Sequence, residues 1–384
     1  MEFGGLKVLM ISSDRNIAVP GSAVSLRMKE YGKLVEELHI VLMCDKTHGL
    51  KETKLDTNVW VYPTNSGASF LRPLGAASLG KKIVLDKKFV RGKSLVTADS
   101  LECGWAGVRV KNTWRIPLEV QLHGDPFSPY FSGFQNGVRK FFARSVLKSA
   151  DSVRTVSRGV AERIQAEFGF GAGKIFVLPI YIDMNRIEEG KVSFDLHARY
   201  GFHFILLVVA RLTKEKNVAQ AIRVLAKVHA YFPDAGLVLV GAGPEEGNLK
   251  DLSKSLGVSN QVIFAGWQED VTSFYRTANL FLQTSRFEGY GLALVEAGLS
   301  GLPVVTTPVG IATELENGID AVVCPQDDDE FMWKAVYDLI QDNARRETMR
   351  THLKRTLEAK LVTKDAYLAK LKENWETTAS RIHE

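Results

Sequence analysis

The stretch Leu280–Ala297, LFLQTSRFEGYGLALVEA, predicts a buried strand, a glycine-containing loop and a helix in succession. Leu280–Gln283 is a short apolar run typical of a strand buried on both faces, and Leu292–Ser300 has the apolar spacing of a helix. Gly289 and Gly291 interrupt regular structure and allow a ligand to approach the backbone closely. Because the first N–H groups of a helix are unpaired and lie at the positive end of its dipole, this stretch predicts a site for a diphosphate.

Similar strand-and-helix units lie on both sides of this stretch and form two alternating halves. In the first half, the runs predicted as strands are Leu6–Ser12, His39–Cys44, Val59–Tyr62, Ser94–Ala98, Leu118–His123 and Asp151–Thr155. In the second half they are Phe204–Ala210, Gly236–Val240, Gln261–Phe264, Leu280–Gln283, Pro303–Thr306 and Ala321–Cys324. Short buried strands that alternate with helices indicate parallel sheets with right-handed crossovers. We therefore expect an α/β fold with two doubly wound, Rossmann-like parallel-sheet domains that face a central cleft.

The domain boundary is expected near residues 183–201, because the polar segment 185–192 precedes the strongest predicted strand. This places a first domain over 1–183 and a second over 184–365. Residues 339–384 have only helical periodicity, so we expect a C-terminal helix over 366–384 that packs back on the first domain.

Composition places the chain among globular proteins. Of its 384 residues, 45% are hydrophobic and 24% are charged, and no apolar run approaches the roughly 20 residues that span a bilayer. The N-terminus lacks the pattern of a secretory signal, so we expect a cytoplasmic protein. Cys44, Cys103 and Cys324 are widely spaced and are expected to be buried free thiols.

Charge is distributed unevenly between the two halves. Residues 1–183 hold 26 Lys and Arg against 17 Asp and Glu, a net +9, whereas residues 184–384 hold 23 against 27, a net −4. Much of the excess lies in Lys81–Lys93, which predicts contact with anionic lipid or phosphate, a solvated helix face being the alternative. Val138–Arg144 is both basic and apolar, which favours a lipid-linked or anionic acceptor at the inner face of a membrane. No nucleic-acid partner is expected.

Charged residues follow the predicted strands of the second half. Glu288 lies in the glycine loop and Glu296 lies in the helix after it, so the two carboxylates address different hydroxyl groups of one ligand. Arg211 and Lys216 follow the strand that ends at Ala210, where a guanidinium and an ammonium can neutralise a diphosphate leaving group.

Two positions of the first half are candidates for ligand contact. His123 ends a strand beside Gly124 and can donate a hydrogen bond to a sugar hydroxyl. Gly21 lies in a loop before a helix and lets backbone N–H groups approach phosphate or acceptor, a plain turn being the alternative.

Three other patterns point away from competing chemistries. Gly241–Pro244 follows a strand but breaks the dinucleotide fingerprint, which disfavours a nicotinamide dehydrogenase. Asp327–Asp329 precedes a predicted helix and is interpreted as its N-cap rather than as a metal site. No Gly-x-Ser-x-Gly motif supports acyl-transfer hydrolysis.

Together these motifs resemble those of the retaining glycosyltransferases of the GT-B fold, family four. The resemblance covers nearly the whole chain and rests on Gly21, His123, Ala150–Val153 with Val156-Ser157, Ala210-Arg211-Leu212 with Lys216, Val240–Pro244, Phe264-Ala265-Gly266 and the Glu-x7-Glu of Glu288 and Glu296. It implies that the second domain binds a nucleotide sugar and that the first binds the acceptor.

The same resemblance implies a role for each matching residue. Arg211 and Lys216 would hold the diphosphate, Glu296 the ribose and Glu288 the transferred sugar. The donor site would be completed by the backbone of Gly289, Tyr290, Gly291 and Leu292, by Gly266 and Trp267 near the base, and by Gly21 and His123 from the first domain. Ser22 and Ile311 stand where the family often has the second glycine of a pair.

The expected activity is therefore metal-independent and cofactor-free transfer of a hexosyl unit from a UDP-, GDP- or ADP-sugar to a glycan or lipid-linked acceptor. The configuration would be retained without a protein nucleophile. A sugar-nucleotide epimerase, a phosphorylase of the same fold and a non-catalytic nucleotide-sugar sensor are the alternatives left open.

Overall fold

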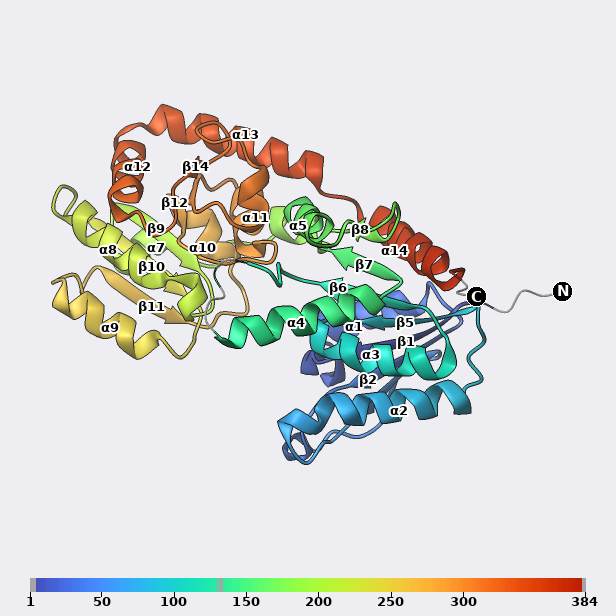
Figure 1. The fold of residues 1–384 in the computed structure, drawn as a ribbon. Helices are drawn as coiled ribbons and strands as arrows, with labels where there is room; N and C mark the ends of the chain where they lie inside the picture. The colour runs from blue at the N-terminus through green and yellow to red at the C-terminus, as the bar shows by residue number, and fades with distance from the viewer. Residues whose placement is uncertain (1–4, 129, 131–133, 382–384) are drawn as a thin grey trace. The chain divides into compact units, whose positions relative to one another are not determined.

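The computed structural model describes residues 5–128, 130 and 134–381, which form two compact α/β units (Figure 1). Unit 1 comprises Met1–Pro179 together with Thr363–Glu384, and unit 2 comprises Ile180–Val362.

Unit 1 is built on one eight-stranded sheet in the order β3-β4-β2-β1-β5-β6-β7-β8. Its strands are β1 (Lys7–Ser12), β2 (Glu37–Leu42), β3 (Thr53–Asp56), β4 (Val59–Pro63), β5 (Ser94–Ala98), β6 (Leu118–Leu122), β7 (Ser152–Thr155) and β8 (Ile175–Val177). All pairs are parallel except β3 with β4. The strand order reverses between β1 and β5, the switch point at which open sheets of this kind bind ligands.

Helices cover this sheet because their apolar faces have no other partner. They are α1 (Ala23–Gly32), α2 (Arg72–Asp86), α3 (Leu101–Trp114), α4 (Phe134–Ser149), α5 (Arg158–Phe168) and α14 (Lys364–Ala379), with short 3₁₀ turns η1 (Arg15–Ala18), η2 (Lys46–His48) and η3 (Ser69–Leu71). All five residues of β6 are buried, so both faces of the sheet are covered.

Helix α14 contacts β5 and β6 and inserts a polar network into unit 1. The buried Glu119 carboxylate accepts hydrogen bonds from Trp375 Nε1 at 3.2 Å and from Asn374. The buried Arg154 guanidinium donates to Tyr367 Oη at 2.9 Å, and Tyr367 bonds Tyr31 at 2.8 Å. Residues far apart in the sequence therefore supply hydrogen bonds to the buried charges of this network, although Arg154 Nε itself has no partner among the described residues.

Unit 2 is built on a six-stranded parallel sheet in the order β11-β10-β9-β12-β13-β14. The strands are β9 (Phe204–Val209), β10 (Ala235–Val240), β11 (Val262–Gly266), β12 (Leu280–Gln283), β13 (Val304–Thr306) and β14 (Val322–Val323). The helices are α6 (Met184–Glu188), α7 (Leu196–Tyr200), α8 (Val218–His229), α9 (Glu246–Ser255), α10 (Thr272–Thr277), α11 (Leu292–Leu299), α12 (Asp329–Gln341) and α13 (Asn343–Lys360), with 3₁₀ turns η4 (Lys214–Lys216) and η5 (Gly310–Glu314). The apolar stripe of α8 lies in the core and consists of Ala221, Val224, Leu225 and Val228.

The twelve predicted strands are all present, two with the predicted bounds and ten with shifted ends. The expected start of the second strand at His39 is wrong by two residues, because Glu37 and Leu38 already pair with Lys7 and Val8. Strands β3 and β8 were not predicted: β3 is polar and lies at an edge, and β8 has only three residues. All three cysteines are buried free thiols, as predicted.

Candidate functional site

The predicted glycine loop follows β12 and leads into α11 at the carboxyl edge of the unit 2 sheet. Gly291 has a φ of 95° and forms the N-cap of α11, a conformation that favours glycine. The loop is fixed from the side by the backbone N–H of Ile311, which donates to Tyr290 O at 2.7 Å. Gly310, with a φ of 58°, packs so closely on Tyr290 that a β-carbon would collide with its carbonyl oxygen. The free N–H groups at the start of α11 are thus held in place.

Lys216 and Glu288 form an ion pair at this edge. Lys216 Nζ lies 2.6 Å from Glu288 Oε2, and the two side chains are only 14% and 13% exposed. The hydroxyl of Ser285 donates to the other carboxylate oxygen of Glu288 at 2.8 Å. The pairing of Lys216 with Glu288 was not foreseen from the sequence, and neither was the role of Ser285, although its position three residues before Glu288 is a local signal. A fixed cation and a fixed acceptor therefore lie side by side.

Arg211 follows β9 on the same connection as Lys216 but lies further out. Its side chain is 75% exposed, and its guanidinium is 3.4 Å from Glu215. The structure therefore leaves Arg211 able to reorient toward an anion, whereas Lys216 is held.

Glu296 lies within α11, away from the ion pair of Glu288. Tyr275 of α10 donates a hydrogen bond from Oη to Glu296 Oε2 at 3.0 Å. Burial raises the pKa of Glu296, and the bond from Tyr275 and the charge of Arg186 oppose that rise. Tyr275 comes from a different helix, so no local pattern around Glu296 pointed to it.

The ends of β10 and β11 lie beside one another near the β9 connection. Gly241 N donates to Gly266 O at 2.7 Å, and a β-carbon on Gly241 would collide with Ala210 O. Gly266 has a φ of 70°, and the indole of Trp267 next to it is 72% exposed. An exposed aromatic ring at the carboxyl edge of the sheet is a platform on which a flat base can stack.

His123 directly follows β6 at the carboxyl edge of the unit 1 sheet. Its side chain is exposed, yet the protein around the imidazole lowers the pKa of His123 to about 4 by desolvation, with a further contribution from Arg154 and Arg27. The imidazole is therefore neutral near pH 7 and can donate one hydrogen bond and accept another.

Gly21 has a φ of 77° and precedes Ser22, the N-cap of α1. Ser22 Oγ accepts from Ser25 N at 3.0 Å and donates to Asn16 O at 2.6 Å. The serine that stands in place of a second glycine therefore caps the helix.

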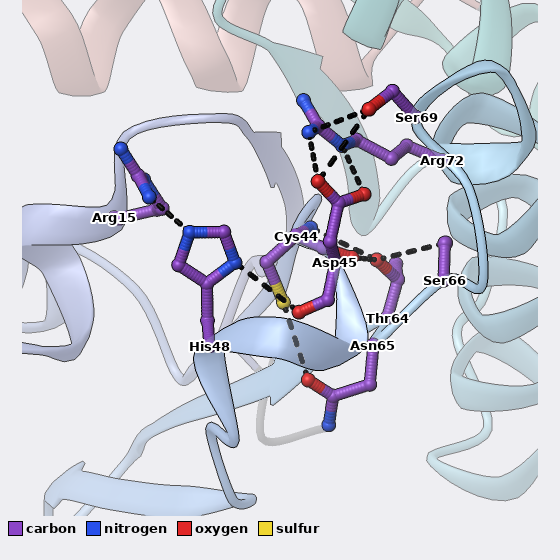
Figure 2. A network of polar contacts seen from close by, with 9 residues as sticks. All are labelled: Arg15, Cys44, Asp45, His48, Thr64, Asn65, Ser66, Ser69 and Arg72. Atoms are coloured by element: carbon purple, nitrogen blue, oxygen red, sulfur yellow. Dashed lines mark hydrogen bonds and ion pairs between the residues drawn. The ribbon is translucent and has the colours of Figure 1, made fainter.

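A polar network that the sequence did not reveal lies near the ends of β1, β2 and β4, and Figure 2 shows its nine side chains. Arg72 Nε donates to Asp45 Oδ1 at 2.7 Å, and this guanidinium lowers the pKa of Asp45. His48 Nδ1 lies 3.2 Å from Asp45 O, so Nδ1 carries the proton and Nε2 accepts from Arg15. The side chains come from separate segments, which is why no single motif indicated them.

The acidic run Asp327–Asp329 forms a helix start. Asp328 Oδ1 accepts from Phe331 N at 2.8 Å, so the predicted N-cap of α12 is confirmed. Asp327 pairs with Arg286 at 2.7 Å and Asp329 with Arg223 at 2.6 Å. Within the described residues, no group of three or more His, Cys, Asp or Glu side chains is arranged to hold a metal ion. Across the same residues, no helix combines the length and the apolar character needed to span a bilayer.

Comparisons with known proteins match both halves of the chain. The family model described as Glycosyl transferases group 1 matches residues 195–356, and the Glycosyl transferase 4-like domain matches residues 56–180. An uncharacterized glycosyltransferase of Methanocaldococcus jannaschii is 27% identical over 241 residues, 60% of this chain and 62% of that protein. The GDP-mannose-dependent alpha-(1-6)-phosphatidylinositol monomannoside mannosyltransferase of Mycolicibacterium smegmatis is 27% identical over 277 residues, 67% of this chain and 72% of that protein. The first of these relatives is thus matched over less than two thirds of its length.

A solved structure shares the fold. HepE of Anabaena in complex with UDP-glucose has a TM-score of 0.73 and 22% identity, and the match covers 98% of this chain and 100% of HepE. The predicted architecture of two parallel α/β sheets is confirmed by this likeness and by the strand order of both units.

Proposed function

We propose that this chain, which belongs to the group 1 glycosyltransferases of the GT-B fold, transfers a hexosyl unit from a nucleoside-diphosphate sugar to an acceptor hydroxyl with retention of configuration. The observation that carries the proposal is the ion pair of Lys216 with Glu288 beside the glycine loop that begins α11. This arrangement offers a fixed positive charge and free N–H groups to a diphosphate, and a fixed carboxylate to sugar hydroxyls.

In the proposed reaction, the bond between the anomeric carbon and the diphosphate oxygen breaks as the acceptor oxygen bonds to the same carbon. The acceptor proton passes to the departing phosphate on the same face, so no protein nucleophile is needed. Negative charge grows on the diphosphate, and Lys216, Arg211 and the start of α11 stabilise it. Because these groups supply the positive charge, the proposed reaction is metal-independent.

The other candidate residues orient the two substrates in this proposal. Glu296, held by Tyr275, accepts from the ribose hydroxyls, and Trp267 with Gly266 lies against the base. Neutral His123 bonds the transferred sugar, and the loop of Gly21 contacts phosphate or acceptor. Both UDP and GDP are named for the proteins compared above, so both remain candidate nucleotides.

For the acceptor, we propose a lipid-linked or anionic molecule at a membrane surface. On α4, Val138 and Phe141 are 57% and 74% exposed, and Lys140 lies between them. Exposed apolar side chains beside a basic one favour the interface of an anionic bilayer. Co-sedimentation with liposomes should therefore increase with the fraction of phosphatidylglycerol, and equal binding to neutral liposomes would contradict this part.

The transfer itself is tested by mass spectrometry and proton NMR of the products formed from UDP-glucose and GDP-mannose, each with a panel of glycan and lipid acceptors and with a chelator. The masses identify the products, and the NMR couplings give the anomeric configuration and the identity of the sugar. We expect a glycoside that keeps the anomeric configuration of the donor, together with released nucleoside diphosphate. An isomerised sugar nucleotide without acceptor would indicate an epimerase, a sugar phosphate would indicate a phosphorylase, and binding without nucleotide release would indicate a sensor. Activity lost in chelator and restored by metal would refute metal independence.

A further inference from the structure

A cavity of about 720 Å³ lies within unit 2 at the amino edge of its sheet. Its lining includes Asn279 and Pro303, which directly precede β12 and β13, together with parts of α10, α11 and α13. Because the strands are parallel, Glu288 and Gly291, which follow β12, lie at the other edge. The cavity is therefore distinct from the proposed donor site.

The cavity gathers positive charge in a unit that is negative overall. Two carboxylates and five basic side chains line it: Glu347, Glu358, Arg276, Arg346, Arg350, Lys354 and Arg355. The cavity thus has a formal charge of +3, from five minus two. Residues 180–362, by contrast, hold 19 Lys and Arg against 24 Asp and Glu, a net −5. Like charges gathered in a concave site repel one another and attract an anion.

Contacts within the protein do not use all of these donors. At the surface of α13, Arg350 pairs with Glu347 at 3.2 Å and Lys354 pairs with Glu358 at 3.6 Å. In the part of the chain that the structure describes, the exposed guanidinium of Arg355 makes no hydrogen bond or ion pair within 4 Å. A ligand that accepts hydrogen bonds can therefore pair with it.

We propose that this cavity binds a small phosphorylated metabolite that carries at least two negative charges. The volume suits a small molecule. Four of the five cations are arginines, whose planar donors match phosphate oxygens in pairs. Arg350 and Lys354 lie one turn apart on α13 and Arg355 is next to Lys354, so a ligand with two anionic groups can contact successive turns. Arg346 contributes charge only, because its guanidinium already donates to Leu339 O, Ile340 O and Asn343 Oδ1.

The cavity is also linked to the donor edge, and this step rests on the proposed function. Tyr275 lines the cavity and donates its hydroxyl to Glu296, the proposed ribose acceptor. Helix α11 begins at the donor loop and ends at Leu299 in the cavity wall. A ligand that shifts Tyr275 or the end of α11 therefore changes the affinity for the nucleotide, and the nucleotide changes the affinity for the ligand by the same factor.

Calorimetric titration of the full chain with inorganic pyrophosphate, in saturating UDP so that the donor edge is occupied, tests the site. One pyrophosphate should bind per chain, and Arg350→Ala/Arg355→Ala should weaken it at least 10-fold. The matched control is Arg345→Ala, which removes an exposed arginine of α13 that does not line the cavity. Unchanged UDP affinity in each variant shows that unit 2 is folded.

Two results would overturn the site: no pyrophosphate binding to the wild type, or equal binding to the double variant. Binding of phosphatidylglycerol vesicles through Arg350 and Arg355, without pyrophosphate binding, would replace the metabolite by a lipid headgroup and overturn the proposal as stated. If UDP fails to bind while pyrophosphate binding depends on these arginines, the proposed function fails and the cavity stands.

The link is measured as the ratio of UDP affinities with and without pyrophosphate. A ratio of about five or more in either direction is expected for the wild type, a typical coupling between sites. Tyr275→Phe should bring the ratio close to one while both ligands still bind. A wild-type ratio of one would refute the link through Tyr275.

Discussion

Replacing Lys216 by alanine should lower kcat/KM for the nucleotide sugar by about 100- to 1,000-fold. The ammonium lies 2.6 Å from Glu288 in a site where both side chains are at most 14% exposed, so water cannot replace the lost charge opposite the diphosphate. Removing one preorganised group that stabilises a developing anion costs about 2.7–4 kcal/mol, which corresponds to that range. The variant also leaves the Glu288 carboxylate without its cation, which should lower the free energy of unfolding by about 1.5–3 kcal/mol.

Both effects are measurable in purified protein. Steady-state release of nucleoside diphosphate gives kcat/KM, and urea denaturation gives the free energy of unfolding. Lys214→Ala is the matched control, because Lys214 lies in the same 3₁₀ turn but is exposed. A double-mutant cycle with Glu288→Gln isolates the energy of the pair. Turnover of Lys216→Ala within threefold of wild type, or an equal loss in Lys214→Ala, would refute the assignment of Lys216 to the leaving group.

Three further predictions concern groups whose environment the structure defines. Tyr367→Phe removes the hydroxyl that joins Arg154 and Tyr31, so urea denaturation should show a loss of about 1–3 kcal/mol. NMR should show that His123 titrates near pH 4, and titration near 6.5 would contradict the environment described. As the pH falls from about 6.5, the unfolded chain takes up this proton before the folded chain does, so the free energy of unfolding should fall between pH 6.5 and 4. The loss should be no more than about 1 kcal/mol, because the ring is exposed. The pKa of Glu296 is raised in the folded protein, so its contribution to stability is greatest at low pH and is lost as the pH rises above 4.5 through the folded pKa. Thermal melts at a series of pH values should show this loss in the wild type but not in Glu296→Gln. If the melting temperatures of the two proteins change with pH in parallel, burial does not destabilise the charged form of Glu296.

Much of the fold could be predicted because its strands are continuous apolar runs. Leu280–Gln283 and Ser94–Ala98 were located to the residue, since each is buried and bounded by polar residues. The polar strand Thr53–Asp56 carries no such signal, because its pairing with β4 is decided by the sheet that it joins. A strand buried in the core requires a run of apolar residues, which the sequence shows, whereas a strand added at the edge of a sheet requires no such run.

The candidate site could be predicted residue by residue but not as an arrangement. Lys216 and Glu288 were each expected to contact the donor, yet nothing in the sequence indicated that they pair with each other across 72 residues. The bond from Tyr275 to Glu296 likewise depends on the packing of α10 against the site. The low pKa of His123 arises from desolvation by the surrounding protein, together with Arg154 and Arg27 on other elements, and such long-range electrostatics have no local motif.

Because α14 belongs to unit 1, the first half of the chain cannot finish folding while it is being made. The nascent 1–179 segment contains Glu119 and Arg154, whose partners Trp375, Asn374 and Tyr367 are translated only after all of unit 2. A ribosome-bound chain that stops before Thr363 therefore has only part of the hydrogen bonds of these two charges, those from Thr97 and Gln121 to Glu119 and from Arg154 to Gln121 and Leu178, and it lacks the cover of α14. Synthesis of residues 363–379 acts as the closing step of assembly, so a protease added to stalled nascent chains should cut the amino-terminal unit until those residues have emerged.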